Sequence, residues 1–250
     1  MNPYYQDDLV TIYHGDFRDV CGGGDVPLPD LVIADPPYGQ TSLAWDAWPT
    51  GWPSSVDGRS MWVFGTLRSF MLHAAEFADA DWKLAQDIVW EKHNGTGAAV
   101  DRFRRVHEQV AHFYRGDWGS VHKAPQFTND ATRRTVRAKT RVPHWGYIAE
   151  RPPYVSHDGG PRLQRSVLRV RSTHGYAENE TQKPVGIIVP LIEFSTASGD
   201  LVFDPFMGAG SVLVAAKAAQ RRAIGVDIRE DQCEIAARRC AQEVLGLEIA

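Results

Sequence analysis

The sequence predicts an α/β fold, in which a mostly parallel sheet carries helices on both faces. Short apolar runs alternate with segments of helical spacing, as in sheets whose strands are buried on both sides. Two of these runs end in turns rich in proline or glycine, each opened by an aspartate, Asp35 and Asp204. Because ligands bind beyond the carboxyl ends of the strands in open α/β sheets, we expect both turns at one binding site.

Seven strands and four main helices are expected along the chain. Each strand is a short apolar run, and each helix has apolar residues at intervals of three and four. The predicted strands cover residues 9–16, 30–35, 60–65, 87–91, 107–115, 201–204 and 223–227. The predicted helices cover residues 67–79, 184–197, 209–221 and 229–245.

Residues 116–175 interrupt this alternation. They are rich in Gly, Pro, Ser, Thr and Arg and contain no long periodic segment. About sixty residues without clear elements are unusual inside a compact domain, which favours an inserted functional region over a loop. The predicted division is therefore one half of the main domain over 1–115, an insert over 116–175 and a second half over 176–250.

Charge is distributed unevenly along the chain. The formal net charge is −4, but residues 115–171 hold 12 Lys and Arg against 4 Asp and Glu. A basic segment on an acidic body suggests contact with a polyanion, although a solvated basic face would have the same composition. The candidate phosphate contacts are Arg133, Arg134, Arg137, Lys139 and Arg141.

The remaining composition predicts a cytoplasmic protein with no metal site and no membrane contact. No apolar run approaches the roughly 18 residues of a membrane span. The first residues lack the basic start and apolar core of a secretion signal. The three cysteines, Cys21, Cys233 and Cys240, are too few and too scattered for a zinc site or a disulfide framework, so apolar packing is their expected role.

The first turn, Asp35-Pro36-Pro37-Tyr38, directly follows an apolar run. Two consecutive prolines fix the backbone and leave carbonyl groups with no paired neighbouring N–H. Together with the Asp35 carboxylate they form a set of acceptors suited to an amino group, and Tyr38 offers a flat surface on which a planar base can stack. The alternative is an ordinary turn with an aromatic contact.

The second turn runs from Asp204 to Ser211 and contains Phe206, Gly208 and Gly210. The glycines allow a ligand to approach the backbone closely, and the helix that follows offers free N–H groups. The spacing is not the G-x-G-x-x-G of dinucleotide sites, and an aspartate before the turn suits an ammonium better than a phosphate. An amino-acid-bearing cofactor is therefore favoured, with an ordinary strand-to-helix turn as the alternative.

Two further residues are expected at the same edge of the sheet. Asp227 ends the next strand about 20 residues after the glycine turn, a spacing at which an acidic residue can bind the hydroxyl groups of a ribose. Lys183 precedes Pro184 at the start of a helix and can reach a carboxylate at that end of the sheet. An exposed lysine at a helix start is the alternative interpretation.

Together these motifs resemble those of the amino-methyltransferases of DNA. The Asp35–Tyr38 motif precedes the glycine turn by about 170 residues, with a long insertion between them. This order resembles the circularly permuted β class, in which the target-recognition region lies in the insertion. Further matches lie at 14–16, 45–46, 63–65, 88–91, 107–108, 166–170 and 181–184, and the resemblance covers about 190 of the 250 positions.

The resemblance implies a Rossmann-like, S-adenosyl-L-methionine-dependent methyltransferase fold with a seven-stranded sheet that has one antiparallel strand. Residues 1–115 would form the catalytic half, 116–175 the target-recognition region and 176–250 the cofactor-binding half, and members of the family often form homodimers. The implied cofactor contacts are Phe206, Gly208, Gly210 and Ser211 at the methionine part, Asp204 and Lys183 at its amino and carboxylate groups, Asp227 at the ribose, Asp16 at the adenine ring, and Asp35.

The expected reaction is methyl transfer to adenine N6 in double-stranded DNA by base flipping and direct in-line attack. The implied catalytic residues are Asp35, Pro36, Pro37 and Tyr38. Asp35 and a proline carbonyl would each accept one N6–H, which frees the nitrogen lone pair, while Tyr38 stacks on the flipped base.

Three alternatives to adenine methylation are kept. Cytosine-N4 methylation is the nearest, and Asp35 favours adenine because the family's cytosine enzymes usually have serine there. Methylation of RNA or of a protein glutamine is disfavoured by the order of the motifs. A non-catalytic DNA-binding module on a methyltransferase scaffold is disfavoured because Asp35, Tyr38 and the glycine turn are all present.

Overall fold

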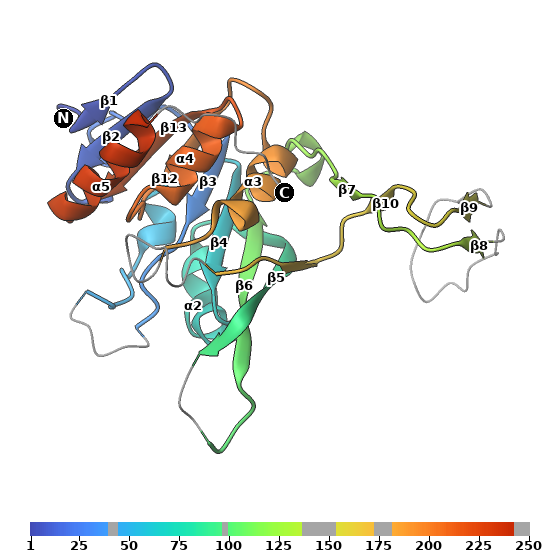
Figure 1. Cartoon of the computed structure of the whole chain (residues 1–250). Coiled ribbons are helices and arrows are strands. Elements are labelled where there is room, and N and C mark those ends of the chain that lie inside the picture. The colour runs from blue at the N-terminus through green and yellow to red at the C-terminus, as the bar shows by residue number, and fades with distance from the viewer. Residues whose placement is uncertain (40–44, 97–99, 137–153, 173–181, 243–250) are drawn as a thin grey trace. The chain divides into compact units, whose positions relative to one another are not determined.

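The computed structural model describes residues 1–39, 45–96, 100–136, 154–172 and 182–242 (Figure 1). The chain forms two compact units, one from Met1–Ala124 with Ser166–Ala250 and one from Pro125–Arg165. No helix within the described ranges is long and apolar enough to cross a membrane.

In the described part of the chain, nine strands form the sheet of the first unit. Across the sheet they are β1 (Tyr5–Gln6), β2 (Val10–His14), β13 (Arg222–Asp227), β12 (Leu201–Asp204), β3 (Leu31–Ala34), β4 (Ser60–Gly65), β6 (Arg105–Tyr114), β5 (Lys83–Thr96) and β11 (Val167–Arg169). β1 and β6 run antiparallel to their neighbours, and all other pairs are parallel. The predicted α/β class with a mostly parallel sheet is thus confirmed.

The strand count differs from the expected seven. The seven predicted strands are β2, β3, β4, β5, β6, β12 and β13, and β6 is the antiparallel member among them. The two additional strands, β1 and β11, are short pieces at the two edges. Strands of two and three residues are too short to show a hydrophobic period, so the sequence gives no sign of them.

Helices cover both faces of the sheet because the side chains of each central strand alternate between the faces (Figure 1). Leu31 and Ile33 of β3 share a core with α3 (Val185–Ser195), α4 (Ser211–Ala218) and α5 (Glu230–Ala241). Val32 and Ala34 share the opposite core with α1 (Phe17–Gly22), α2 (Leu67–Asp79) and the 3-10 turn η1 (Trp52–Ser54). A second 3-10 turn, η2 (Trp118–Ser120), follows β6.

The helix α2 has the bounds that the sequence predicts. Thr66 and Ser69 form a capping box, in which each side chain accepts a hydrogen bond from the backbone of the other residue, and this fixes the start of the helix. The other three predicted helices are each shorter in the structure, since Pro184, Gly210 and Arg229 are N-cap residues and not helical ones.

The strand β5 departs furthest from its prediction. The sequence predicts it over 87–91, but it extends from Lys83 to Thr96; it pairs with β6 from Lys83 to Glu91 and, after a register shift, again at Thr96. Its additional residues at the carboxyl end are polar, so no apolar run indicates that the strand continues.

The second unit contains two small antiparallel pairs among its described residues. They are β7 (Phe127–Thr128) with β10 (Arg162–Leu163), and β8 (Arg134–Val136) with β9 (Tyr154–Ser156). Ala131 joins them, because its N–H donates to Gly160 at 3.1 Å and its carbonyl accepts from Gly159 at 2.9 Å. This unit lies within the predicted insert 116–175, whereas β11, from the same stretch, belongs to the main sheet.

Candidate active site

Four neighbouring parallel strands each lead into an aspartate at one rim of the sheet. In sheet order the strands are β2, β13, β12 and β3. Because parallel strands end at the same rim, the turns that follow them lie beside one another. The aspartates, in the same order, are Asp16, Asp227, Asp204 and Asp35.

The 35–38 turn and the 204–211 turn lie at adjacent positions on this rim. Their strands, β3 and β12, are direct neighbours, and Phe203 pairs with Val32. The carboxylate of Asp35 contributes to the electrostatic environment of Asp204, which also places the two groups near each other.

The carboxylate of Asp35 accepts a hydrogen bond on each of its oxygens. The Tyr38 hydroxyl donates to Oδ1 at 2.5 Å, and the Lys183 ammonium donates to Oδ2. Burial raises the pKa of Tyr38 well above its ordinary value, and the nearby Asp35 carboxylate adds to the rise. Tyr38 therefore keeps its proton and acts as a donor. Pro36 is buried and Pro37 is half-buried.

Lys183 lies between Asp35 and a second carboxylate, Glu108 on β6. Its Nζ is 3.6 Å from Oε2 of Glu108, and its side chain is only 12% exposed. Burial alone would lower the pKa of Lys183, but Asp35 and Glu108 outweigh burial and raise it. The ammonium is consequently charged at neutral pH and links two strands of the rim.

Glu108 is held from its other side by Lys92 on β5, which donates to Oε1. Burial would raise the pKa of Glu108, but the charges of Lys183 and Lys92 lower it. Sequence reasoning did not assign Glu108 or Lys92 to the site. The one signal in the sequence for Glu108 was the family match at 107–108. Lys92 is a polar residue after an apolar run, and such a position gives no signal of a role in the site.

Asp204 is a buried carboxylate, with 3% of its surface exposed. Its Oδ1 accepts a hydrogen bond from the N–H of Phe206 at 3.0 Å. Burial raises the pKa of Asp204 well above its ordinary value, and the negative charges of Asp35 and Asp227 raise it further. A cation placed against Asp204 would stabilise its ionised form.

The glycine turn is built from two left-handed residues. Gly208 has φ 48° and donates its N–H to Oδ2 of Asp227 at 2.9 Å. Gly210 has φ 73° and caps α4, which begins at the buried Ser211. A Cβ on Gly210 would lie 2.8 Å from Cβ of Ala236 on α5, so this glycine is required by helix packing as well as by its backbone angle.

Asp227 and Asp16 continue the rim beyond the glycine turn. Oδ1 of Asp227 accepts from the N–H of Arg229 at 2.9 Å, and burial raises the pKa of this carboxylate. Asp16 caps α1 by accepting from the N–H of Arg18 at 2.8 Å. Between them and Asp204, the ring of Phe206 packs edge-on against Phe17, with centroids 5.0 Å apart.

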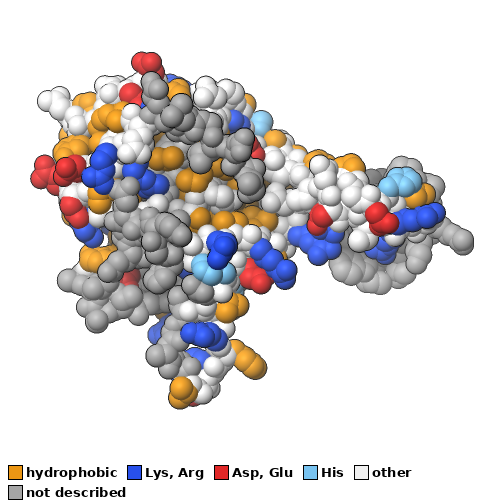
Figure 2. Space-filling view, viewed as in Figure 1, with side chains coloured by type: hydrophobic (Ala, Val, Ile, Leu, Met, Phe, Trp, Pro, Cys, Tyr) orange, Lys and Arg blue, Asp and Glu red, His pale blue; other side chains and the backbone are white. Residues whose placement is uncertain are grey.

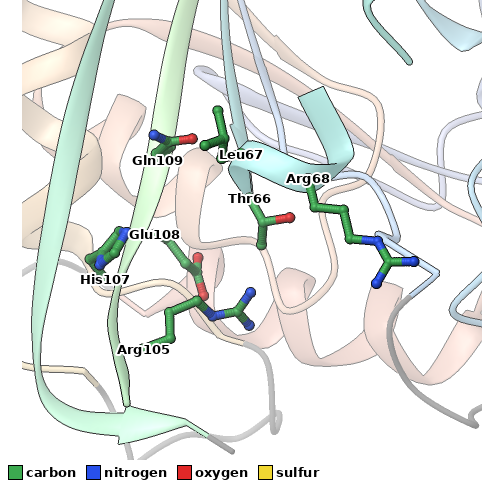
Figure 3. A pocket seen from close by; sticks show the side chains of 7 residues that line it. All are labelled: Thr66, Leu67, Arg68, Arg105, His107, Glu108 and Gln109. Carbon is green, nitrogen blue, oxygen red and sulfur yellow. The ribbon is translucent and has the colours of Figure 1, made fainter. Parts of the chain in front are cut away.

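A cavity of about 160 Å³ opens beside this rim, between the end of β4 and the start of β6 (Figure 3). The side chains of Glu108 and Arg105 extend from β6 toward the strand-to-helix turn at Thr66. The cavity is lined by Thr66, Leu67, Arg68, Arg105, His107, Glu108 and Gln109. Because Glu108 contacts Lys183, the cavity borders the ion pair that holds Asp35.

The predicted DNA contacts lie in the second unit. Arg133 and Arg134 are exposed at the start of β8, and the N–H of Arg133 donates to Asp158 at 2.6 Å. Arg137, Lys139 and Arg141 lie outside the described residues. Their part in DNA binding stays a prediction.

Two solved structures illustrate the similarity of this fold to known ones. The structure titled M1.HpyAVI–SAM complex matches with a TM-score of 0.63 and 20% sequence identity, over 92% of this chain and 100% of that one. The PvuII DNA methyltransferase, titled cytosine-N4-specific, matches with a TM-score of 0.65 and 15% identity, over 99% of this chain and 90% of that one. At these identities the likeness establishes the fold.

Residues 29–238 match the family model of the N6_N4_Mtase DNA methylases, and the chain belongs to this family. A relative from Xanthomonas campestris pv. cyanopsidis, the Type II methyltransferase M.XycI, is 30% identical over 162 residues, which are 64% of this chain and 45% of that protein. The chain spans about half the length of the curated relatives that it matches first.

Proposed function

We propose that the chain transfers a methyl group to N6 of adenine in double-stranded DNA, by base flipping and direct in-line attack. The observation that carries the proposal is the adjacency of the Asp35 turn and the buried Asp204 turn on neighbouring parallel strands. One turn offers acceptors for an amino group and the other a buried anion for an amino-acid cofactor. The family match to DNA methylases supports the same reaction.

The methyl donor is S-adenosylmethionine, which supplies an electrophilic methyl group on a sulfonium. Asp204 suits the ammonium group of the cofactor, because a nearby cation most strongly stabilises the ionised form of a carboxylate whose pKa is raised by burial. Asp227 suits the ribose hydroxyls and Asp16 the adenine ring, since they follow β13 and β2, the next two strands after β12 on that side of the sheet. Phe206, Gly208, Gly210 and Ser211 would line the methionine part.

We assign Lys183 to Asp35 and not to the carboxylate of the cofactor. Its ammonium already has two carboxylate partners, Asp35 and Glu108. In this arrangement Lys183 holds the carboxylate of Asp35 in place, and Tyr38 donates to it from the other side.

The chemistry required of Asp35 is to accept hydrogen bonds from the target amine. The lone pair of an exocyclic adenine nitrogen is delocalised into the ring, which makes N6 a poor nucleophile. If Asp35 and the carbonyl of Pro36 or Pro37 each accept one N6–H, the nitrogen is drawn toward tetrahedral geometry and its lone pair is freed. Positioning and electrostatics then supply most of the catalysis, with no covalent enzyme intermediate.

The target base must leave the helix to reach this rim. Unstacking costs a few kcal/mol, and stacking on the Tyr38 ring offsets roughly 1–3 kcal/mol of that cost. We assign the basic segment 115–171 to the contacts with the DNA phosphates and with the recognised bases, which makes binding depend on salt.

The reaction is tested by incubating the purified chain with labelled S-adenosylmethionine and unmethylated phage λ DNA, followed by nucleoside analysis. The expected product is N6-methyl-2′-deoxyadenosine, and Asp35→Ala should abolish it while cofactor binding is largely retained. If Asp35→Ala keeps near-normal turnover, the assignment of Asp35 is wrong.

Cytosine-N4 methylation is the second candidate. It involves the same attack by an exocyclic amine, and a cytosine-N4-specific enzyme is among the structures that share the fold. Recovery of N4-methyl-2′-deoxycytidine and no N6-methyl-2′-deoxyadenosine in the same digest would favour it. The Type II methyltransferases among the relatives place either reaction in a restriction–modification context.

A further inference from the structure

The strands β5 and β6 continue past the rim of the sheet as a two-stranded hairpin (Figure 1). β4 pairs with β6 only as far as Gln109, and β11 pairs with β5 only as far as Glu91. Beyond Glu91, among the described strands, the ladder between β5 and β6 is interrupted by a register shift and resumes with the pair Thr96 and Arg105. The hairpin therefore projects from the same end of the sheet that carries the candidate active site.

The base of the hairpin is joined to the active-site carboxylate by ion pairs. Lys92 on β5 pairs with Glu108 on β6, and Glu108 lies 3.6 Å from the ammonium of Lys183, which contacts Asp35. A macromolecule that places a base at Asp35 would thus also lie against the hairpin.

The tip of the hairpin combines exposed apolar and basic side chains. Phe103 and Val100 are completely exposed, at 101% and 100%. Arg102 and Arg104 flank Phe103 in the sequence and are exposed as well, and Arg102 pairs with the exposed Asp101 at 2.6 Å. Figure 2 shows this mixture of hydrophobic and basic side chains over the lower part of the view. A fully exposed phenylalanine is unfavourable in water, so its burial in a complex would be favourable.

Duplex DNA is the partner that this combination fits. Phosphates on either side of a base step suit the flanking arginines, and apolar side chains that enter a duplex partly unstack a step and bend the helix. Phe103 has the required exposure, and it extends from the rim at which the flipped base would be held.

We propose that the tip of the β5–β6 hairpin enters duplex DNA beside the target base, with Phe103 stacked in the helix and Arg104 on a flanking phosphate. This inference rests on the proposed function, because it takes DNA as the substrate of the Asp35 site. It adds a second DNA contact, separate in sequence from the basic segment 115–171.

The test compares Phe103→Ala with wild type in methyl transfer to unmethylated λ DNA and in the binding of its fluorescently labelled fragments at several salt concentrations. Phe103→Ala should lower kcat/KM for DNA about tenfold or more and leave cofactor affinity and the salt slope unchanged. Phe103→Trp should retain most activity. Arg104→Gln should weaken binding and reduce the salt slope by about one.

The matched control is Leu84→Ala, which removes an exposed apolar side chain at the opposite end of the same strand, β5. If wild type methylates λ DNA and Phe103→Ala equals Leu84→Ala in both rate and binding, the hairpin proposal is overturned while the proposed function stands. If wild type methylates no DNA, the proposed function fails, and the fragment-binding comparison alone decides the hairpin. If Phe103→Ala loses as much binding to anionic lipid vesicles as to DNA fragments, the hairpin proposal is also overturned, since the tip would then act as a general basic surface.

Discussion

Lys183 donates a hydrogen bond to Asp35, a residue 148 positions earlier in the chain. The contact joins the start of α3 to the turn after β3, and Glu108 on β6 extends it to a second strand. The carboxylate at the centre of the proposed reaction is therefore held by a cation whose own charge is maintained by two anions.

Replacing Lys183 with methionine should lower the turnover number by about 10- to 100-fold, because Asp35 loses the partner that positions it. Lys183→Arg should recover part of the rate. Steady-state kinetics and cofactor calorimetry measure both variants, with the exposed Lys83→Met as control. A weakened cofactor affinity with an unchanged turnover number would instead indicate that Lys183 binds the carboxylate of the cofactor.

Cofactor affinity should rise with pH in the acidic range and level off above the raised pKa of Asp204. Below that pKa the carboxyl group is protonated in the free protein, and it must lose its proton before it can pair with an ammonium. Binding should therefore release a proton, which calorimetry in buffers of different ionisation enthalpy detects. Asp204→Asn should bind more weakly and show no proton release. Release of a full proton by the asparagine variant would contradict the assignment.

Gly210→Ala should destabilise the protein by about 3 kcal/mol. Roughly 1 kcal/mol comes from a left-handed backbone angle and the remainder from the clash of the new Cβ with Ala236. Gly199→Ala is the matched control, because Gly199 has φ 87° and nothing within 4 Å of an added Cβ. Its expected loss is about 1 kcal/mol. Urea unfolding of both variants measures the difference, and equal losses would show that packing against α5 does not require the glycine.

Asp7→Asn should lower the free energy of unfolding by about 1 kcal/mol at pH 7. Burial would raise the pKa of Asp7, but the hydrogen bond from Lys217 and those from the N–H groups of Leu9 and Val10 lower it to about 2. The stabilisation is present above the ordinary pKa of 3.8 and is lost as the pH falls toward 2. The two proteins should therefore converge in stability in acid. Asp8→Asn, which changes the exposed neighbouring residue, serves as control. If Asp7→Asn and wild type still differ in the free energy of unfolding at pH 2, the lowered pKa of Asp7 is not the source of the stabilisation.

The parts of the fold that the sequence predicts best are those with local signals. α2 has a capping box and a regular apolar period, and the strands before Asp35 and Asp204 are continuous apolar runs. The hairpin extension of β5 has neither signal, because residues 92–96 contain no apolar side chain whose period could indicate a buried face.

The candidate site was predictable in its position and less so in its contacts. Asp35 and Asp204 could be placed together because parallel strands share a rim. The pairing of Lys183 with Glu108 could not, since it depends on β6 running antiparallel beside β4 and on the side-chain packing at that edge. Long-range ion pairs leave no periodic trace in a sequence.

The strand order also constrains how the protein is made. β12 and β13 come from the last fifty residues, yet they occupy the gap between β2 and β3 in the finished sheet. Until the ribosome has released them, the two N-terminal pieces of the sheet lack the strands that join them, and one side of β2 and one side of β3 stay open. Such edges attract other chains. A stalled or truncated translation product is therefore expected to need chaperones, whereas the full chain closes both edges itself.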